Sequence, residues 1–306
     1  MLISIPGWST INNKIFQSKT FQHFLKNPMA VVGALILLVF VVVSISAPLI
    51  TPQNPYDTGV LSLSKNFLPP VWSEGGEMPY IFGTDSQGRD IFSSIVYGAR
   101  ISLLVGFSVV LLAGSVGATL GLIAGFLGGA IDTLIMRIAD TFFSFPSMLL
   151  ALLIMGVIGE RGVHIVILSL TLIEWVRYAR TMHGNVLVKK EMDYTEAARS
   201  IGASNLRIMF KHIFPNALTP LLVIAMVSLG KVIMLESTLS FLGVGVPVTR
   251  PSLGMLIANG REYVYSGRWW LIVFPGVCLF IIIMGVNLIG DWLRDELNPK
   301  RSTVNV

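Results

Sequence analysis

The sequence predicts an all-α integral membrane protein with about six transmembrane helices. Of its 306 residues, 53% are hydrophobic and only 13% are charged, about half the charged fraction of a soluble domain. The apolar residues also gather into runs near the roughly 20 residues that a helix needs to cross a bilayer. Composition and run length therefore agree on a multi-pass membrane protein.

The predicted spans, in chain order, are Met29–Ile50, Ile101–Gly125, Ile135–Ile158, Val163–Trp175, Pro220–Val244 and Trp270–Ile289. The fourth is the shortest. Pro146 predicts a kink in the third span, which suits either a helix that lines a path or simple bending.

Small residues recur every fourth position in the second span, a spacing that lets membrane helices approach closely. They are Ala113, Gly117, Gly121 and Gly125. We interpret them as a packing face rather than as a ligand site.

The charged residues predict that both termini are cytoplasmic, because cytoplasmic loops are enriched in Lys and Arg. The first 28 residues carry three lysines and no acid, and the connection between the fourth and fifth spans is also basic. The connection between the first two spans is acidic. Three arginines, Arg250, Arg261 and Arg268, would lie on the outer side against this rule.

This orientation divides the chain into five parts. We expect a cytoplasmic N-terminal tail at 1–28, the first transmembrane helix at 29–50, an extracytoplasmic loop at 51–96, a five-helix core at 97–291 and a cytoplasmic C-terminal tail at 292–306.

The long polar insert within the core, 194–215, reads YTEAARSIGASNLRIMFKHIFP. Asp193 and Glu196 have the spacing of a capping box, which predicts a helix start. Gly202 predicts the end of that helix, and Ser204 predicts a second start. Pro215 is expected to end or kink the second helix before the next span.

Four apolar residues of the second helix have a spacing that predicts one shared face. They are Leu206, Met209, Phe210 and Ile213. A cationic surface is expected on the opposite side of the segment, formed by Arg199, Arg207 and Lys211.

The insert resembles the EAA loop of ABC-importer permeases. The matching positions are Glu196, Ala197, Ala198, Gly202 and Pro215. The resemblance implies a cytoplasmic coupling helix that docks into a groove on an ATPase subunit. The alternative is an amphipathic hairpin on the membrane surface, in which Glu196 is only a cap.

Two positions depart from the EAA-loop pattern. His212 stands where isoleucine is commonest, and Phe214 replaces leucine. His212 is nevertheless similar to the peptide-importer branch of the family.

A second stretch, FGTDSQGRDIFSSIVYGARISL from Phe82 to Leu103, is similar to the C-type permease subunits of dipeptide and oligopeptide importers. PPVWSEGGEM before it and GVNLIGDWLRDELNPK near the end extend the resemblance over nearly the whole chain. Arg89 is expected to form a polar cluster with Asp85 and Asp90 at the membrane surface. That cluster either positions the second helix or contacts a substrate-binding protein.

The fifth span contains two charged residues, Lys231 and Glu236. Lys231 lies roughly 16 Å along the helix from Pro220, near mid-membrane, where an ionisable group should face protein or water. A separation of five residues, about 140° of rotation, prevents a good pair between the two. They either line the passage and meet the charged termini of a peptide, or pair structurally with another subunit.

The sequence contains no GxxxxGK[ST] phosphate loop, and Gly230–Lys231 is followed by valine within an apolar span. It also contains no HExxH, CxxC or GxSxG motif, and its four histidines lie in different segments. We therefore expect no catalytic residue, no metal and no bound cofactor in this chain, with ATP and Mg on partner subunits.

The resemblance implies a type I ABC-importer permease fold in the bacterial cytoplasmic (inner) membrane, and half of a transmembrane pathway for dipeptides or short oligopeptides. The implied partners are a homologous second permease in a heterodimer, two cytoplasmic ATPases, an extracytoplasmic peptide-binding protein and the lipid bilayer, with no nucleic acid. The chain itself is not expected to be an enzyme.

Two alternatives from other classes remain. A secondary transporter or channel independent of an ATPase would normally show inverted halves, and an intramembrane enzyme would need converging catalytic groups. The residues also leave open whether the cargo is a dipeptide, a longer peptide, glutathione, haem or a nickel chelate, and whether the two ATPases are identical.

Overall fold

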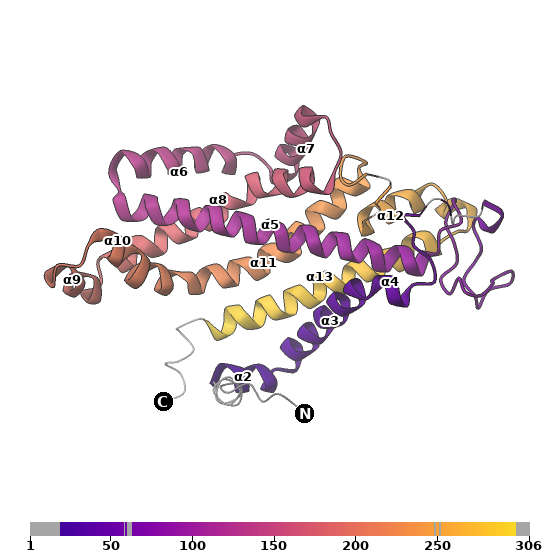
Figure 1. The fold of residues 1–306 in the computed structure, drawn as a ribbon, viewed down its shortest axis with the longest axis horizontal. Helices are drawn as coiled ribbons and strands as arrows, with labels where there is room; N and C mark the ends of the chain where they lie inside the picture. The colour runs from indigo at the N-terminus through magenta and orange to yellow at the C-terminus, as the bar shows by residue number, and fades with distance from the viewer. Residues whose placement is uncertain (1–18, 58, 60–62, 248, 251, 298–306) are drawn as a thin grey trace, which may run out of the picture.

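The computed structural model describes residues 19–57, 59, 63–247, 249–250 and 252–297, and most of them are helical (Figure 1). No β-strand occurs among these residues; the one pairing of that kind is an isolated bridge between Thr84 and Asp90. The all-α prediction is confirmed. Most of the predicted tails, 1–18 and 298–306, lie outside the described residues.

The long helices α5, α8, α11 and α13 follow the long axis of the molecule (Figure 1). The short helices α9 and α10 lie at one end, and α12 lies at the other beside the loop that precedes α5 (Figure 1). We call these the inner and outer ends, following the orientation predicted from the charges.

The N-terminal part forms helices α2 (Lys19–Lys26), α3 (Pro28–Ile45) and α4 (Ala47–Ile50). Asn27 is the N-cap of α3, and its Oδ1 accepts the N–H of Ala30 at 3.1 Å. The predicted single helix 29–50 is broken at Ser46, because Pro48 has no N–H to continue the ladder. α3 packs closely on α13, where Gly33 faces the carbonyl of Gly285.

Helix α5 (Ile91–Leu127) begins at Ile91 rather than at Ile101, so residues 91–96 of the predicted outer loop are helical. Helix α8 (Val163–Lys190) runs well beyond the predicted end at Trp175. Polar residues do not end a helix, so an apolar run marks the hydrocarbon crossing and not the full helix.

The predicted third span is wrong as a single kinked helix. It consists of α6 (Gly129–Phe143) and α7 (Ser147–Ile158), which are bent by 94° at the break. Pro146 lies directly before α7 with an extended ψ of 126°. Proline also disfavours helical geometry in the residue before it, so the chain turns sharply here.

The remaining elements are η2 (Leu63–Lys65), α9 (Asp193–Ser200), α10 (Asn205–Arg207), η3 (Ile208–Ile213), α11 (Phe214–Phe241), α12 (Leu253–Arg261), η4 (Val264–Ser266) and α13 (Trp270–Glu296). α10, η3 and α11 form one continuous helical run, Asn205–Phe241.

Among the described residues, four helices are long and apolar enough to cross a membrane, and the bent pair α6–α7 would be a fifth. The four are Pro28–Ile45, Ile91–Leu127, Asn205–Phe241 and Trp270–Glu296. α8, the remaining predicted span, is not among them, because Glu174, Arg177 and Arg180 interrupt its apolar run.

The α5–α8 contact leads to a test of the small-residue stripe. A Cβ at Gly121 would lie 2.2 Å from the carbonyl oxygen of Ala179, so Gly121→Val must push the helices apart. We expect this overpacking to lower stability by about 3 kcal/mol, measured as thermal unfolding of the purified protein. The control is Gly184→Ala in α8, where nothing lies within 4 Å of the added Cβ. Equal thermal stability of the two variants would contradict the close packing.

Candidate functional site

The predicted coupling segment at the inner end folds as two short helices around a glycine turn (Figure 1). Gly202 has φ +80°, and the N–H of Ala203 donates to the carbonyl of Ala198 at 3.0 Å, which closes α9. The predicted glycine stop is therefore confirmed. In this left-handed conformation glycine avoids the strain that a Cβ would introduce.

The predicted capping box is wrong, because α9 begins one residue earlier than expected. Met192 occupies the N-cap position and makes no side-chain cap. Asp193 and Glu196 instead both lie in the first turn, where the helix dipole favours acidic side chains. Glu196 is therefore exposed and does not reach back to the backbone of Asp193.

The second half of the segment begins as predicted, with Ser204 Oγ accepting the N–H of Arg207 at 3.4 Å. Of the two outcomes expected at Pro215, an end or a kink, the end does not occur, because the helix continues through it into α11. The turn before it, η3, is π-helical, and the N–H of Phe214 donates to the carbonyl of Met209. This wider turn lies next to Pro215, whose missing N–H would interrupt a regular ladder.

The apolar residues of this helix do not share one face as predicted. Met209 and Ile213 are buried, whereas Leu206 is 67% exposed and Phe210 is 56% exposed. The π-helical turn changes the rotation between residues, so the spacing of a regular α-helix does not apply. Ile201, at 85% exposed, joins Leu206 and Phe210 as the inner apolar patch.

Basic side chains accompany this inner apolar patch on the same segment. Arg199, Arg207 and Lys211 are all exposed, as are Glu196 and Ala197. The predicted cationic character of the segment is therefore present at its surface.

Two buried contacts attach α9 to the bundle. Thr195 Oγ1 donates to the carbonyl of Lys189 at 2.8 Å, which ties α9 to the end of α8. Ala198, 4% exposed, packs in the same cluster as Phe126 of α5 and Val186 of α8. Two of the EAA-like positions thus differ in role, since Ala198 faces the bundle while Ala197 faces outward.

Lys231 forms an ion pair within its own chain. Its Nζ lies 2.6 Å from Glu174 Oε1 on α8 and 3.4 Å from Ser147 Oγ at the start of α7. Glu174 is 2% exposed, so the pair connects three helices in the interior. Glu174 was not among the candidate site residues, although an acid inside an apolar run is a signal for one.

Glu236 is fully buried and lies apart from Lys231. Its carboxylate accepts hydrogen bonds from Ser102 of α5 at 2.8 Å, Ser240 at 2.8 Å and Ser237 at 3.4 Å. None of the ion pairs among the described residues includes it. Hydroxyl groups therefore satisfy this carboxylate where the sequence suggested a charged partner.

At the outer end, Asp85, Arg89 and Asp90 lie together in the turn before α5, but no ion pair joins their side chains. Asp85 Oδ1 accepts the backbone N–H groups of Gln87 and Arg89 at 2.8 and 2.9 Å. Asp90 is the N-cap of α5, and its Oδ2 accepts the N–H of Ser93 at 2.8 Å. Burial raises the pKa of both carboxyl groups. The three residues of the expected polar cluster are thus held in one turn by hydrogen bonds to backbone groups.

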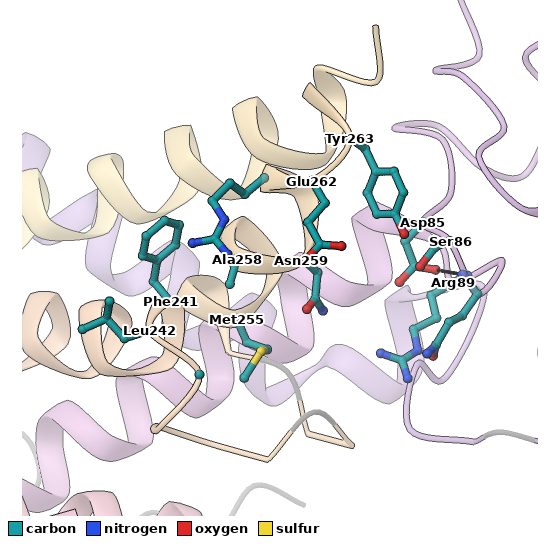
Figure 2. A pocket seen from close by; sticks show the side chains of 13 residues that line it. Asp85, Ser86, Arg89, Phe241, Leu242, Met255, Ala258, Asn259, Glu262 and Tyr263 are labelled. Carbon is teal, nitrogen blue, oxygen red and sulfur yellow. Dashed lines mark hydrogen bonds between the residues drawn. The ribbon is translucent and has the colours of Figure 1, made fainter. Parts of the chain in front are cut away.

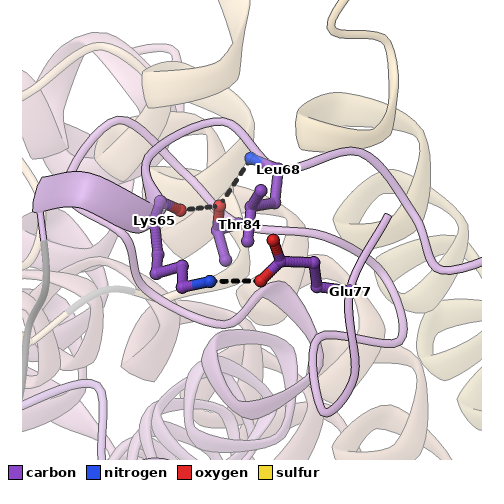
Figure 3. Close-up of polar contacts among 4 residues, drawn as sticks. All are labelled: Lys65, Leu68, Glu77 and Thr84. Carbon is purple, nitrogen blue, oxygen red and sulfur yellow. Dashed lines mark hydrogen bonds and ion pairs between the residues drawn. The ribbon is translucent and has the colours of Figure 1, made fainter. Parts of the chain in front are cut away.

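Thr84 anchors the preceding outer loop (Figure 3). Its Oγ1 donates to the carbonyl of Lys65 at 2.6 Å and accepts the N–H of Leu68 at 2.8 Å, while Lys65 also forms an ion pair with Glu77. The indole of Trp270 donates to the carbonyl of Thr84 at 3.3 Å. The loop is therefore tied to the start of α13.

Comparison with known proteins places this arrangement in a class. Residues 117–303 match the family described as binding-protein-dependent transport system inner membrane component, and residues 18–70 match the N-terminal transmembrane domain of oligopeptide transport permease C. The protein is thus a multi-pass permease subunit of the inner membrane, with a transport role and no catalytic one. In this class, partner subunits bind and hydrolyse ATP.

The chain belongs to the family of binding-protein-dependent transport system inner membrane components. It is 36% identical over 278 residues to the dipeptide transport system permease protein DppC of Haemophilus influenzae, covering 91% of this chain and 92% of the relative. It is 39% identical over 280 residues to DppC of Escherichia coli, covering 92% of each chain.

Among solved structures, a chain of the MetNI methionine ABC transporter in inward-facing conformations has the same fold. The TM-score is 0.55 at 21% identity, over 67% of this chain and 96% of that chain. The type I permease fold is therefore confirmed. The groups of three or more His, Cys, Asp or Glu that a metal would need are absent from the described residues.

The buried ion pair leads to a prediction about its two halves. Lys231→Met leaves Glu174 buried without a cation, so we expect a loss of about 3 kcal/mol in stability. Adding Glu174→Gln should recover most of that loss, because no uncompensated charge remains. Thermal unfolding of the single and double variants measures the coupling. Strictly additive effects would show that the pair contributes nothing as a pair.

Proposed function

We propose that this chain is the C-type permease subunit of an ATP-driven importer of dipeptides or short oligopeptides. The observation that carries the proposal is the 36–39% identity to dipeptide permeases over more than nine-tenths of the chain. A homologous second permease would complete the pathway, two ATPases would bind ATP and Mg, and an extracytoplasmic binding protein would deliver the peptide. We also propose the five-part division of the chain with the outer loop at 51–96 and the core at 97–291, although α5 itself begins at Ile91.

The segment from Glu196 to Pro215 is the proposed docking element for the ATPases. The inner apolar patch supports this, because large apolar side chains at a protein's aqueous end mark a contact surface. Exposed basic residues beside the patch would meet an acidic rim on the ATPase. Glu196, exposed in the first turn of α9, is free to contact the partner.

The docking element is built to transmit movement in both directions. α9 is tied to the end of α8 through Thr195, and α10 continues without a break into η3 and α11. A displacement imposed by ATPase closure would therefore reach both α8 and α11. We propose that the bundle alternates between inward-open and outward-open states biased by the ATPases.

The Lys231–Glu174 pair has a proposed structural role in this cycle. Lys231 is 32% exposed at its side chain while Glu174 is 2% exposed, so only the lysine side of the pair can reach a pathway. Glu236, fully enclosed by serines, is proposed to anchor α11 to α5 and not to contact cargo.

The proposed function is tested by reconstituting the chain with its second permease, ATPases and binding protein in proteoliposomes. ATP-dependent uptake of a labelled dipeptide, with hydrolysis stimulated by the loaded binding protein, is the expected result. Uptake that proceeds without the ATPases would overturn the importer proposal.

Variants of the docking element should separate folding from coupling. Leu206→Asp places a charge in the inner apolar patch, and Gly202→Val strains the turn at φ +80°. We expect both proteins to insert normally, with ATP-driven uptake reduced at least tenfold because docking is weakened. Glu196→Ala should act in the same direction.

The matched control is Thr133→Ala, an exposed position in α6 outside the docking element, whose hydroxyl donates to the carbonyl of Gly129 within the same helix. It should leave uptake unchanged. Normal transport by all three docking variants would exclude a coupling role for this segment.

A further inference from the structure

A polar cavity of about 350 Å³ lies at the outer end between the Asp85–Arg89 turn, the end of α11 and helix α12 (Figure 2). This volume is within the range of sites that enclose small molecules. Phe241 of α11 contributes apolar surface, and Asn259 and Glu262 contribute polar groups from α12 and its end.

Arg89 lines this cavity as a largely buried cation. The residue is 6% exposed, and its buried Nε has no hydrogen-bond partner. No carboxylate of a described residue forms an ion pair with it. An arginine stays protonated, and a buried charge is strongly unfavourable without a counter-ion. An anion from outside the chain would therefore be stabilised beside Arg89.

The hydrogen bonds of the two neighbouring carboxyl groups come from backbone and serine groups and not from the guanidinium of Arg89. Asp85 Oδ1 accepts two backbone N–H groups of its own turn. Asp90 faces α5, where its Oδ2 accepts hydrogen bonds from Ser93. Burial raises the pKa of Asp85, while the charge of Arg89 acts in the opposite direction. Neither group replaces an external anion beside Arg89.

The side of the cavity formed by the end of α12 carries a carboxylate that is not part of an ion pair in the described part of the chain. Glu262 is exposed and forms no ion pair among the described residues, and it adjoins Arg261, whose guanidinium lies 5.3 Å from the centre of the Phe241 ring. The cavity thus combines Arg89 on the side of the turn with Asn259 of α12 and with Arg261 and Glu262 at the end of α12. A ligand with both charges matches this lining better than a single acidic side chain, which would leave Glu262 and much of the volume unused.

We propose that this cavity binds a short zwitterionic peptide at the outer end of the permease, with Arg89 receiving its C-terminal carboxylate and Glu262 its ammonium group. A guanidinium offers a carboxylate two parallel hydrogen bonds, which a lysine cannot match. This assignment rests on the proposed peptide import and adds a permease site to the selection made by the binding protein.

The test uses the whole permease–ATPase complex in lipid nanodiscs, without nucleotide and without binding protein. The probe is alanyl-p-benzoylphenylalanine, a photoreactive dipeptide, compared with its C-terminal amide. We expect the free acid to label the cavity lining between Met255 and Tyr263, located by mass spectrometry. The amide should label it at least tenfold less, because the group that Arg89 binds is missing.

Variants of Arg89 test whether this residue causes the difference in labelling between the free acid and the amide. Arg89→Gln should reduce labelling by the free acid to the level of the amide, and Arg89→Lys should retain part of it. Arg161→Gln, an exposed arginine in the connection between α7 and α8, should change nothing. The comparison of acid with amide in the unaltered protein needs no variant, so it decides the question even if Arg89 is needed for folding.

Equal labelling by acid and amide would overturn the assignment. So would an Arg89→Gln protein that labels normally but binds the binding protein more weakly, which would indicate that an acidic side chain of that partner occupies the cavity. Dipeptide uptake by the reconstituted wild type distinguishes failure of the cavity assignment from failure of the proposed function. Uptake without carboxylate-dependent labelling overturns only the cavity assignment, whereas absence of peptide uptake overturns the proposed function and the cavity assignment together.

Discussion

The close contact between α5 and α8 is the constraint on which the rest of the bundle depends. A Cβ at Gly117 would lie 2.3 Å from the carbonyl oxygen of Trp175, and one at Gly121 would lie 2.2 Å from that of Ala179. Only glycine permits backbones to approach this closely. α8 is therefore held along α5, and the orientation of everything attached to α8 follows from it.

Charged groups inside the bundle contact neighbouring helices, because hydrocarbon offers them no partners. Glu174 of α8 and Lys231 of α11 neutralise each other, and Ser147 brings the start of α7 to the same point. Glu236 connects α11 to α5 through Ser102. These contacts give the helices a defined lateral arrangement that apolar packing alone would specify weakly.

The continuous run Asn205–Phe241 joins the two ends of the molecule. It begins in the inner segment that carries the apolar patch and ends at Phe241, which lines the outer cavity. α12 packs tightly on the same run, since a Cβ at Gly254 would lie 2.2 Å from the carbonyl oxygen of Ser237. One helix thus contributes both to the surface proposed for ATPase contact and to the cavity proposed for peptide binding.

The sequence by itself determined the membrane class, the helical character and the glycine turn at Gly202, because run length, charge and backbone conformation are local properties. It also placed Asp85, Arg89 and Asp90 in one turn. Tertiary structure decided the rest: the partner of Lys231, the serine shell of Glu236, the sharp break at Pro146 and the passage of a helix through Pro215. The first two depend on which segments meet in space, and a distant carboxylate leaves no periodic signal along the chain. The last two depend on how the backbone accommodates a proline, and neither a sharp break nor a π-helical turn leaves such a signal.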